Sequence, residues 1–215
     1  MRAAQINSYG GKEVMSTTND AAKPKPAADQ ILVEVHAAGV NPFDWKVREG
    51  YMQQMVPLVF PATLGGDVAG VVAEVGQDVT TFTAGQEVFG QANSLSGVGA
   101  FAEFSPVGAE SLASKPKTLD FAVAAAVPLA AASAYQAIID TLAVKSEQKI
   151  LIHGGAGGIG GFAIQLAKHL GAHVATTATP EDIDYVRDLG ANKVIDYTTQ
   201  QFEQAEKDKR TLFAL

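Results

Sequence analysis

The sequence predicts an α/β protein of two domains, with a β-rich domain over residues 1–118 and part of a doubly wound sheet over residues 119–215. Three observations lead to this prediction. Short apolar runs separated by glycine-containing turns fill the first half, an Ala-rich segment without such turns follows, and strand and helix patterns then alternate. The length of 215 residues fits one large domain or two small ones.

The clearest strand pattern of the first half is Ile31–Ala37, where apolar residues at odd positions alternate with Glu34 and His36. Further short strands are expected at residues 67–75, 87–89 and 100–104. Many short strands with frequent turns are typical of a compact barrel or sandwich. We therefore expect the first domain to be a closed or two-layered β structure.

The second half predicts helices and strands in alternation. One or two packed helices are expected within Asp120–Ala143, whose only turn signal is Pro128. The elements after them are expected to be, in order, a strand over 149–153, a helix over 157–170, a strand over 172–177, a helix that begins after Thr179 and a strand over 192–197. This β-α-β-α-β series is half of a doubly wound sheet.

Composition excludes several classes of protein. The formal net charge is −7 and no Lys/Arg cluster is present, so we expect no nucleic-acid partner and no anionic membrane surface. The absence of Cys excludes disulfides, thiol nucleophiles and Cys-based zinc sites. Residues 1–7 lack a signal-peptide core, and no apolar run approaches the ~20 residues that span a bilayer. A soluble, cytoplasmic protein is the expectation.

A glycine-rich segment joins the first strand of this series to its helix. The segment fits the pattern Gly-x-Gly-x-x-Gly and consists of Gly155, Ala156, Gly157, Gly158, Ile159 and Gly160. In this context glycines permit a tight turn and let the backbone approach a pyrophosphate at a helix N-terminus. We therefore predict dinucleotide binding, the alternative being a glycine-rich turn without a ligand.

The identity of the dinucleotide depends on the end of the second strand. NAD sites usually carry an acidic residue there, whereas Ala175–Thr179, with Thr177 at its centre, contains none. This absence favours NADPH. Glu181 and Asp182 follow closely and the first basic residue is Arg187, so NADH remains the alternative.

Five blocks, in this order along the chain, resemble the medium-chain dehydrogenase/reductase superfamily. They are Asn41–Lys46, Leu64–Val72, Ala84–Gly90, Val127–Tyr135 and Gly155–Gly160. The match is to the zinc-independent branch of quinone oxidoreductases and enone reductases. The resemblance implies a GroES-like catalytic domain followed by a Rossmann cofactor domain. The activity it implies is hydride transfer from NADPH to a quinone or an α,β-unsaturated carbonyl.

Zinc independence follows from two positions within that resemblance. Zinc-containing relatives have Cys where Asn41 stands and His where Gly66 stands. Neither residue offers the missing ligand, and the chain has no Cys elsewhere. We therefore expect no metal at this site.

The resemblance also implies roles for three residues near the acceptor. Asn41 corresponds to an Asn that lines the substrate pocket, although side-chain bonds in an Asn-Pro turn explain it equally well. Lys46 stands where relatives place a group that faces the acceptor and can bind a developing oxyanion; the alternative is a solvated lysine. Tyr51 can donate similarly or simply cover the pocket.

Three further residues are expected at the cofactor. Ser133 corresponds to a hydroxyl residue that touches the nicotinamide amide, the alternative being a helix serine bonded to its own backbone. Tyr197 corresponds to a Tyr around the adenosine phosphate, or only ends a strand. Thr177 ends the second strand beside the glycine segment.

Members of this superfamily are longer than this sequence, which stops after the third strand of the cofactor domain. Half of the nucleotide sheet and the usual dimer edge are therefore expected to be missing, although a homodimer is still conceivable. The alternative to an active reductase is a truncated, catalytically silent nucleotide-binding or interaction protein.

Overall fold

The computed structural model describes residues 1–202. The chain forms two compact units, Met1–Leu129 and Ala130–Leu215. The sequence predicted a domain boundary after residue 118, whereas the boundary between these units along the chain follows Leu129. The difference arises because helix α2 (Phe121–Ala125) packs on the first unit, where Ala124 and Ala125 are buried against Ala69.

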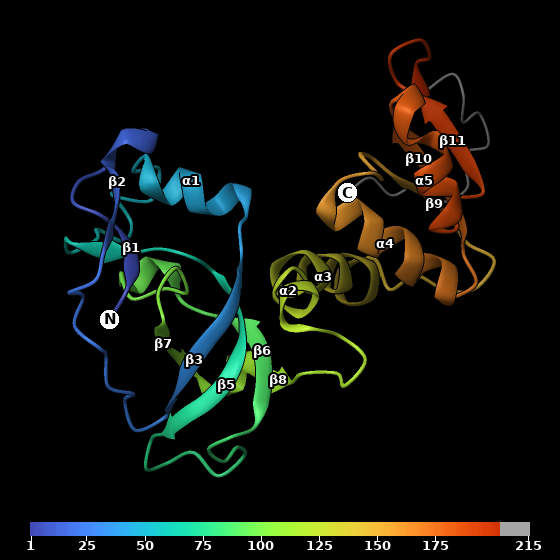
Figure 1. Cartoon of the computed structure of the whole chain (residues 1–215). Coiled ribbons are helices and arrows are strands. Elements are labelled where there is room, and N and C mark those ends of the chain that lie inside the picture. The colour runs from blue at the N-terminus through green and yellow to red at the C-terminus, as the bar shows by residue number, and fades with distance from the viewer. Residues whose placement is uncertain (203–215) are drawn as a thin grey trace. The chain divides into compact units, whose positions relative to one another are not determined.

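A five-stranded antiparallel sheet dominates the first unit, with the order β7-β3-β5-β6-β8 (Figure 1). Its strands are β3 (Gln30–Gly39), β5 (Asp67–Val75), β6 (Glu87–Gln91), β7 (Phe104–Gly108) and β8 (Leu112–Ser114). Ile31 and Val33 on β3 are fully buried in one core with Val68 and Val72 of β5. The alternation over residues 31–37 therefore marks a real strand, in which Leu32 is also buried while Glu34 and His36 are exposed.

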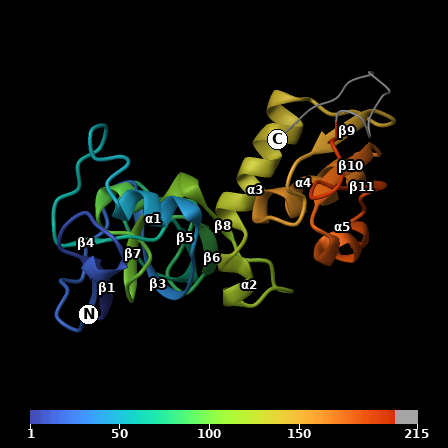
Figure 2. The same cartoon turned by 90° about the horizontal axis from the view of Figure 1, so that it is seen from above.

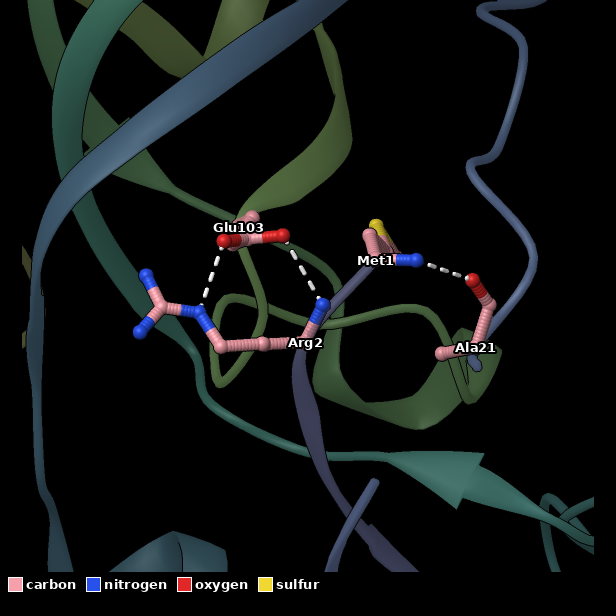
Figure 3. Close-up of polar contacts among 4 residues, drawn as sticks. All are labelled: Met1, Arg2, Ala21 and Glu103. Carbon is pink, nitrogen blue, oxygen red and sulfur yellow. Dashed lines mark hydrogen bonds and ion pairs between the residues drawn. The ribbon is translucent and has the colours of Figure 1, made fainter. Parts of the chain in front are cut away.

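A second, three-stranded sheet completes the first unit in the order β2-β1-β4. It contains β1 (Ala3–Ile6), β2 (Met15–Thr18) and β4 (Ala62–Thr63), and the unit's short helices are α1 (Pro42–Arg48), η1 (Lys12–Val14), η2 (Ser94–Ser96) and η3 (Ala109–Ser111). The backbone N–H and Nε of Arg2 both donate to Glu103 at 2.8 Å (Figure 3). The Met1 amine donates to the Ala21 carbonyl, so the two residues before β1 are held to two other segments of the chain.

The expected strand at residues 100–104 is wrong, because the strand β7 starts where that range ends. Residues 100 and 101 instead donate their N–H groups to Gly65 and Leu64, and Ala102 forms an isolated bridge with Ala3. This segment therefore passes between the two sheets rather than adding a strand. The expected strands over 67–75 and 87–89 are confirmed by β5 and β6.

The junction is helical, as predicted. Asp120 caps α2 by accepting a hydrogen bond from the N–H of Val123 at 2.7 Å. After Val127, α3 (Pro128–Tyr135) begins with proline at its first position, where no N–H is needed, and continues into a π-helical stretch, η4 (Gln136–Thr141).

The second unit has a parallel three-stranded sheet in the order β11-β10-β9 (Figure 2). Its elements are β9 (Lys149–Ile152), α4 (Gly158–His169), β10 (His173–Ala178), η5 (Pro180–Asp182), α5 (Ile183–Asp188) and β11 (Lys193–Asp196). Gly171 ends α4 with a φ of +83°, a conformation that favours glycine. The predicted β-α-β-α-β series is confirmed.

Two apolar clusters hold this second unit together, and the larger one lies between the sheet and α4. The side chains of Ile150, Ile152 and Val174 on the strands are 0–1% exposed and pack against Ile164 of α4. Helix α4 therefore lies on the sheet by its apolar face, which places its N-terminus at the carboxyl end of β9. Within residues 1–202, no helix is long and apolar enough to cross a bilayer.

Candidate functional site

The glycine segment lies between the carboxyl end of β9 and the N-terminus of α4. Gly155 and Gly160 are buried, whereas Gly157, Gly158 and Ile159 are exposed. Helix α4 starts at Gly158 without a side-chain cap, so the N–H groups of its first turn have no intrahelical acceptor. An anion placed at these exposed residues meets free donors and the positive end of the helix dipole.

The glycines serve two separate purposes. A Cβ on Gly160 would lie 2.3 Å from the carbonyl oxygen of Gly154 and 2.8 Å from Cα of Gly155, so helix and loop touch there backbone to backbone. A Cβ on Gly157 would meet only the Gly154 oxygen, at 3.3 Å. Space outside Gly157 is therefore open on the side that a ligand's phosphates would occupy, and the cradle fits a dinucleotide pyrophosphate.

Thr177 holds this cradle in shape. Its side-chain oxygen accepts a hydrogen bond from the N–H of Gly154 at 2.9 Å, and its carbonyl accepts one from the N–H of Gly155 at 3.1 Å. The residue is only 4% exposed. Thr177 lies at the predicted place beside the segment, with its hydroxyl occupied by the loop itself.

The other cofactor residues stay closer to solvent. Ser133 is half-buried on α3, and within residues 1–202 its hydroxyl has no hydrogen-bond partner, so the alternative of a serine bonded to its own helix backbone is absent. Tyr197 directly follows β11 and is 56% exposed. The structure leaves both side chains available to a ligand.

No carboxylate lies at the end of β10, as the sequence indicated. Along the chain, the first acidic residue after β10 with a described contact is Asp182, whose Oδ2 accepts a hydrogen bond from the Thr179 hydroxyl at 2.9 Å, and across the sheet Asp196 of β11 pairs with Ala178. Arg187, the first basic residue, forms an exposed ion pair of 3.5 Å with Asp184. Each of these charges therefore has a partner on its own segment.

In the first unit, one face of α1 lines a cavity of about 450 Å³. Asn41 precedes the helix, and Asp44, Trp45 and Arg48 follow it at spacings of three, four and seven residues, which lie on one helical face. The remaining wall is formed by Ala4, Met15, Val40, Leu64 and Phe101. The cavity is thus largely apolar with a few polar groups, as small-molecule sites usually are.

Lys46 and Tyr51 do not line this cavity. Lys46 is exposed, and its Nζ lies 5.7 Å from the centre of the Trp45 ring. Tyr51 is 60% exposed and meets Trp45 edge to face, with 5.5 Å between ring centres. Five positions after Asn41, Lys46 points away from the helical face that carries the cavity wall.

Two buried aspartates flank Asn41. Oδ2 of Asp44 accepts a hydrogen bond from the Asn41 backbone N–H at 2.7 Å, and Oδ2 of Asp67 accepts one from Asn41 Nδ2 at 2.8 Å. Burial raises the pKa of both carboxyl groups, and the hydrogen bonds from Asn41 oppose that rise. Asp67 could not be recognised from the sequence, because a single Asp at a strand start carries no signal of its partner.

Gly66, which stands where zinc-containing relatives have His, has no side chain that could bind a metal ion. A Cβ on Gly66 would lie 4.0 Å from Oδ1 of Asp44, a buried oxygen without a hydrogen-bond partner in the described part of the chain. Among residues 1–202, no group of three or more His, Cys, Asp and Glu side chains is arranged to hold a metal ion.

Two family models match the chain in the order of its two units. The Alcohol dehydrogenase GroES-like domain matches residues 27–117, and the Zinc-binding dehydrogenase family matches residues 158–212. A chloroplastic quinone-oxidoreductase homolog of Spinacia oleracea is 35% identical over 206 residues, which cover 94% of this chain and 62% of the relative. The chain belongs to the medium-chain dehydrogenase/reductase superfamily. The predicted fold class, a GroES-like domain followed by a partial Rossmann domain, is confirmed.

Further relatives are quinone and enone oxidoreductases. The chloroplastic NADPH-dependent alkenal/one oxidoreductase of Arabidopsis thaliana is 40% identical over 211 residues, 94% of this chain and 54% of that protein. The Escherichia coli quinone oxidoreductase complexed with NADPH matches with a TM-score of 0.84 and 30% identity, over 95% of this chain and 61% of that one. The chain spans 54–62% of the length of the curated relatives it matches.

The glycine geometry predicts a large loss of stability for one substitution and a small change for its neighbour. Gly160→Ala should destabilise the second unit by about 1–3 kcal/mol, because its Cβ collides with backbone that cannot move aside. Gly158→Ala should change stability by less than about 1 kcal/mol, because its Cβ meets only the Ala130 side chain at 3.7 Å. Urea unfolding followed by far-UV circular dichroism measures both. Equal losses in the two variants would contradict the close approach at Gly160.

The raised pKa of Asp67 predicts a pH dependence of stability. Its folded pKa lies above the ordinary unfolded value of about 3.9, so the folded chain binds this proton more readily and stability falls as pH rises through that window. The stability of the wild type relative to Asp67→Asn should therefore increase as pH is lowered from neutral. Chemical unfolding at several pH values, followed by the fluorescence of Trp45, measures it.

Glu103→Gln provides the control with the opposite sign. Hydrogen bonds from Arg2 lower the pKa of Glu103, so its contribution is present near neutral pH and is lost as pH falls through the folded pKa. A wild-type advantage over Asp67→Asn that shrinks on acidification, as it should for Glu103→Gln, would contradict the raised pKa of Asp67.

Proposed function

We propose that this protein is a zinc-independent oxidoreductase that transfers a hydride from NADPH to a quinone or an α,β-unsaturated carbonyl compound. The observation that carries the proposal is the glycine cradle between β9 and α4, open at Gly157 and closed at Gly160. Membership of the quinone and enone oxidoreductase branch supports the reaction class.

The second unit supplies the groups proposed to hold the cofactor. The backbone of residues 155–160 binds the pyrophosphate, with Thr177 keeping the loop in place. Ser133 offers to the nicotinamide amide a hydroxyl that has no hydrogen-bond partner among residues 1–202, and Tyr197 offers an exposed ring near the adenosine phosphate. The bound cofactor supplies the hydride, and these residues bind and orient it.

NADPH is proposed over NADH for two reasons. The end of β10 carries no carboxylate, which in NAD sites bonds the ribose hydroxyls and would repel a 2′-phosphate. Two relatives are also described with NADPH, one as NADPH-dependent and one as a complex with it. The acidic residues that follow, Glu181 and Asp182, keep NADH as the alternative.

The apolar cavity beside α1 is the proposed acceptor site. Trp45, Leu64 and Phe101 offer apolar surface to a flat, weakly polar molecule, and Asn41 is one of the few polar groups in the wall. Lys46 and Tyr51 lie beside Trp45, outside the wall, so their proposed role is to donate hydrogen bonds to an acceptor that extends beyond it.

Zinc independence is proposed from the chemistry of the residues present. Asn41 and Gly66 replace the Cys and His of zinc-containing relatives, and neither supplies an equivalent ligand. Quinones and enones accept a hydride with hydrogen-bonding assistance alone, so no Lewis acid is required. A cytoplasmic location and a homodimer also remain proposals; relatives include chloroplastic and mitochondrial proteins.

Thermal melting of the purified chain with NADPH or NADH, followed by a turnover assay, tests the proposed function. A ligand present at ~100 times its Kd stabilises the folded state by about 2.7 kcal/mol, so NADPH should raise the melting temperature more than NADH does. NADPH oxidation should then depend on added quinone or enone.

Gly157→Asp is the matched control, because it fills the open side of the cradle with a carboxylate that repels the pyrophosphate. The variant should melt as the wild type does without ligand and lose both the shift and the turnover. A cooperative melt without any shift would contradict cofactor binding. A shift without turnover would favour a catalytically silent nucleotide-binding protein.

A further inference from the structure

Asp67 is a buried carboxylate that contacts the wall of the proposed acceptor cavity and has no role in the proposed function. Asp67 is the first residue of β5 and is 1% exposed. Its Oδ2 accepts a hydrogen bond from Nδ2 of Asn41 at 2.8 Å, and its Oδ1 accepts one from the backbone N–H of Leu129 at 3.1 Å. Both oxygens are therefore used, one of them on a residue of the cavity wall.

This contact determines which end of the Asn41 amide faces the carboxylate. When Asp67 is ionised, its carboxylate only accepts hydrogen bonds, so the NH₂ group is the end of the amide that faces it. A half-turn of the amide would bring its oxygen against the carboxylate, with two acceptors at about 2.8 Å. A charge-assisted hydrogen bond would thereby be exchanged for a repulsion.

The backbone of Asn41 is fixed as well. Its N–H donates to Oδ2 of Asp44 at 2.7 Å, and Asn41 occupies the N-cap position of α1. Two separate carboxylates, from different parts of the first unit, thus hold the main chain and the side chain of one residue. The amide oxygen, Oδ1, is bound by neither carboxylate; it faces the backbone N–H of Asp44 in the capping box of α1 and keeps a second lone pair for a further donor.

We propose that Asp67 is a positioning residue that fixes the Asn41 amide with its oxygen available to the cavity, so that Asn41 accepts a hydrogen bond from an O–H or N–H group of the bound ligand. This inference rests on the proposed function for the nature of that ligand. Asn41 then selects for hydrogen-bond donors in the cavity.

The chemistry of the reactants makes this selection specific. A quinone or simple enone presents only carbonyl oxygens, which the Asn41 oxygen repels. Sugar hydroxyls and the carboxamide N–H groups of a nicotinamide nucleotide are donors, and so are the hydroxyls of a reduced quinone. Asn41 therefore binds one of these donors, and the developing oxyanion must be stabilised by another group.

Exchanging the two side chains tests the inference. In the double variant Asn41→Asp with Asp67→Asn, the amide of residue 67 can still accept from Leu129 and donate to the carboxylate at 41, whose second oxygen remains an acceptor for the ligand. Asn41→Asp alone brings two carboxylates together, and Asp67→Asn alone lets the Asn41 amide turn. The exchange thus restores the acceptor that each single variant loses.

The full chain should be assayed near neutral pH for NADPH oxidation by a quinone. Each single variant should lower kcat/KM by about tenfold or more, as expected for a lost hydrogen bond to a charged group. The exchanged pair should recover to within about threefold of the wild type, a coupling that a double-mutant cycle measures. Because the exchange would also restore a purely structural contact, the discriminating result is a loss of kcat/KM in a single variant that still melts as the wild type does. An exchanged pair that melts as the wild type does but stays as impaired as the single variants would overturn the proposal.

A measurement without ligand separates this inference from the proposed function. In the full chain labelled with ¹⁵N at asparagine side chains, the Asn41 amide protons, assigned from the signals lost in Asn41→Asp, should exchange with solvent more slowly than those of the exposed Asn19. The slow exchange should disappear in Asp67→Ala. If the wild type has no turnover, the proposed function fails, but the rate of hydrogen exchange still tests whether the Asn41 amide is held by Asp67. Asn41 amide protons that exchange with solvent as fast as those of Asn19 in the wild type would overturn the proposal that Asp67 positions Asn41.

Discussion

The second unit depends on the close approach of helix α4 to the loop that follows β9. The absence of a side chain at Gly160 lets the helix backbone touch the loop at Gly154 and Gly155, and two hydrogen bonds to Thr177 hold that loop against the neighbouring strand. Because the helix is seated so closely, its uncapped first turn is presented at the carboxyl end of β9. The same packing that stabilises the unit therefore creates the anion-binding cradle.

A different constraint organises the first unit around Asn41. Two carboxylates are buried beside one residue at the cost of desolvation, which raises the pKa of both. Hydrogen bonds from the main chain and side chain of Asn41 offset part of that cost. Buried charges that are retained at such a place are typical of a functional site, where a fixed side-chain orientation matters more than maximal stability.

The second unit could be predicted almost completely from sequence, because its signals are local. The strand before Gly155, the helix after Gly157 and the glycine at 171 each follow from spacing and turn chemistry within a few residues. In the first unit the same reasoning found β3, β5 and β6 but missed the whole sheet β2-β1-β4, in which β4 lies more than 50 residues after β1. Strand pairing of this kind depends on contacts that no local pattern records.

The candidate site was predictable to the same uneven degree. No helix was predicted over residues 42–48, so the shared face of Asp44, Trp45 and Arg48 became apparent only in the structure, although their spacing from Asn41 is helical. The hydrogen bond between Asn41 and Asp67 joins residues 26 positions apart and had no such signal. Lys46 and Tyr51 were inferred from resemblance alone, and their place beside Trp45, outside the cavity wall, required the structure.

The most direct test of the central claim follows the transferred hydrogen itself. The chain would be mixed with an α,β-unsaturated ketone and NADPH deuterated at the transferable position of its nicotinamide ring, and the product analysed by NMR and mass spectrometry. Hydride transfer predicts one deuterium on the β-carbon of the saturated ketone, with one NADPH oxidised for each product formed. Product without deuterium, or NADPH that remains reduced in the presence of a folded chain, would contradict the account.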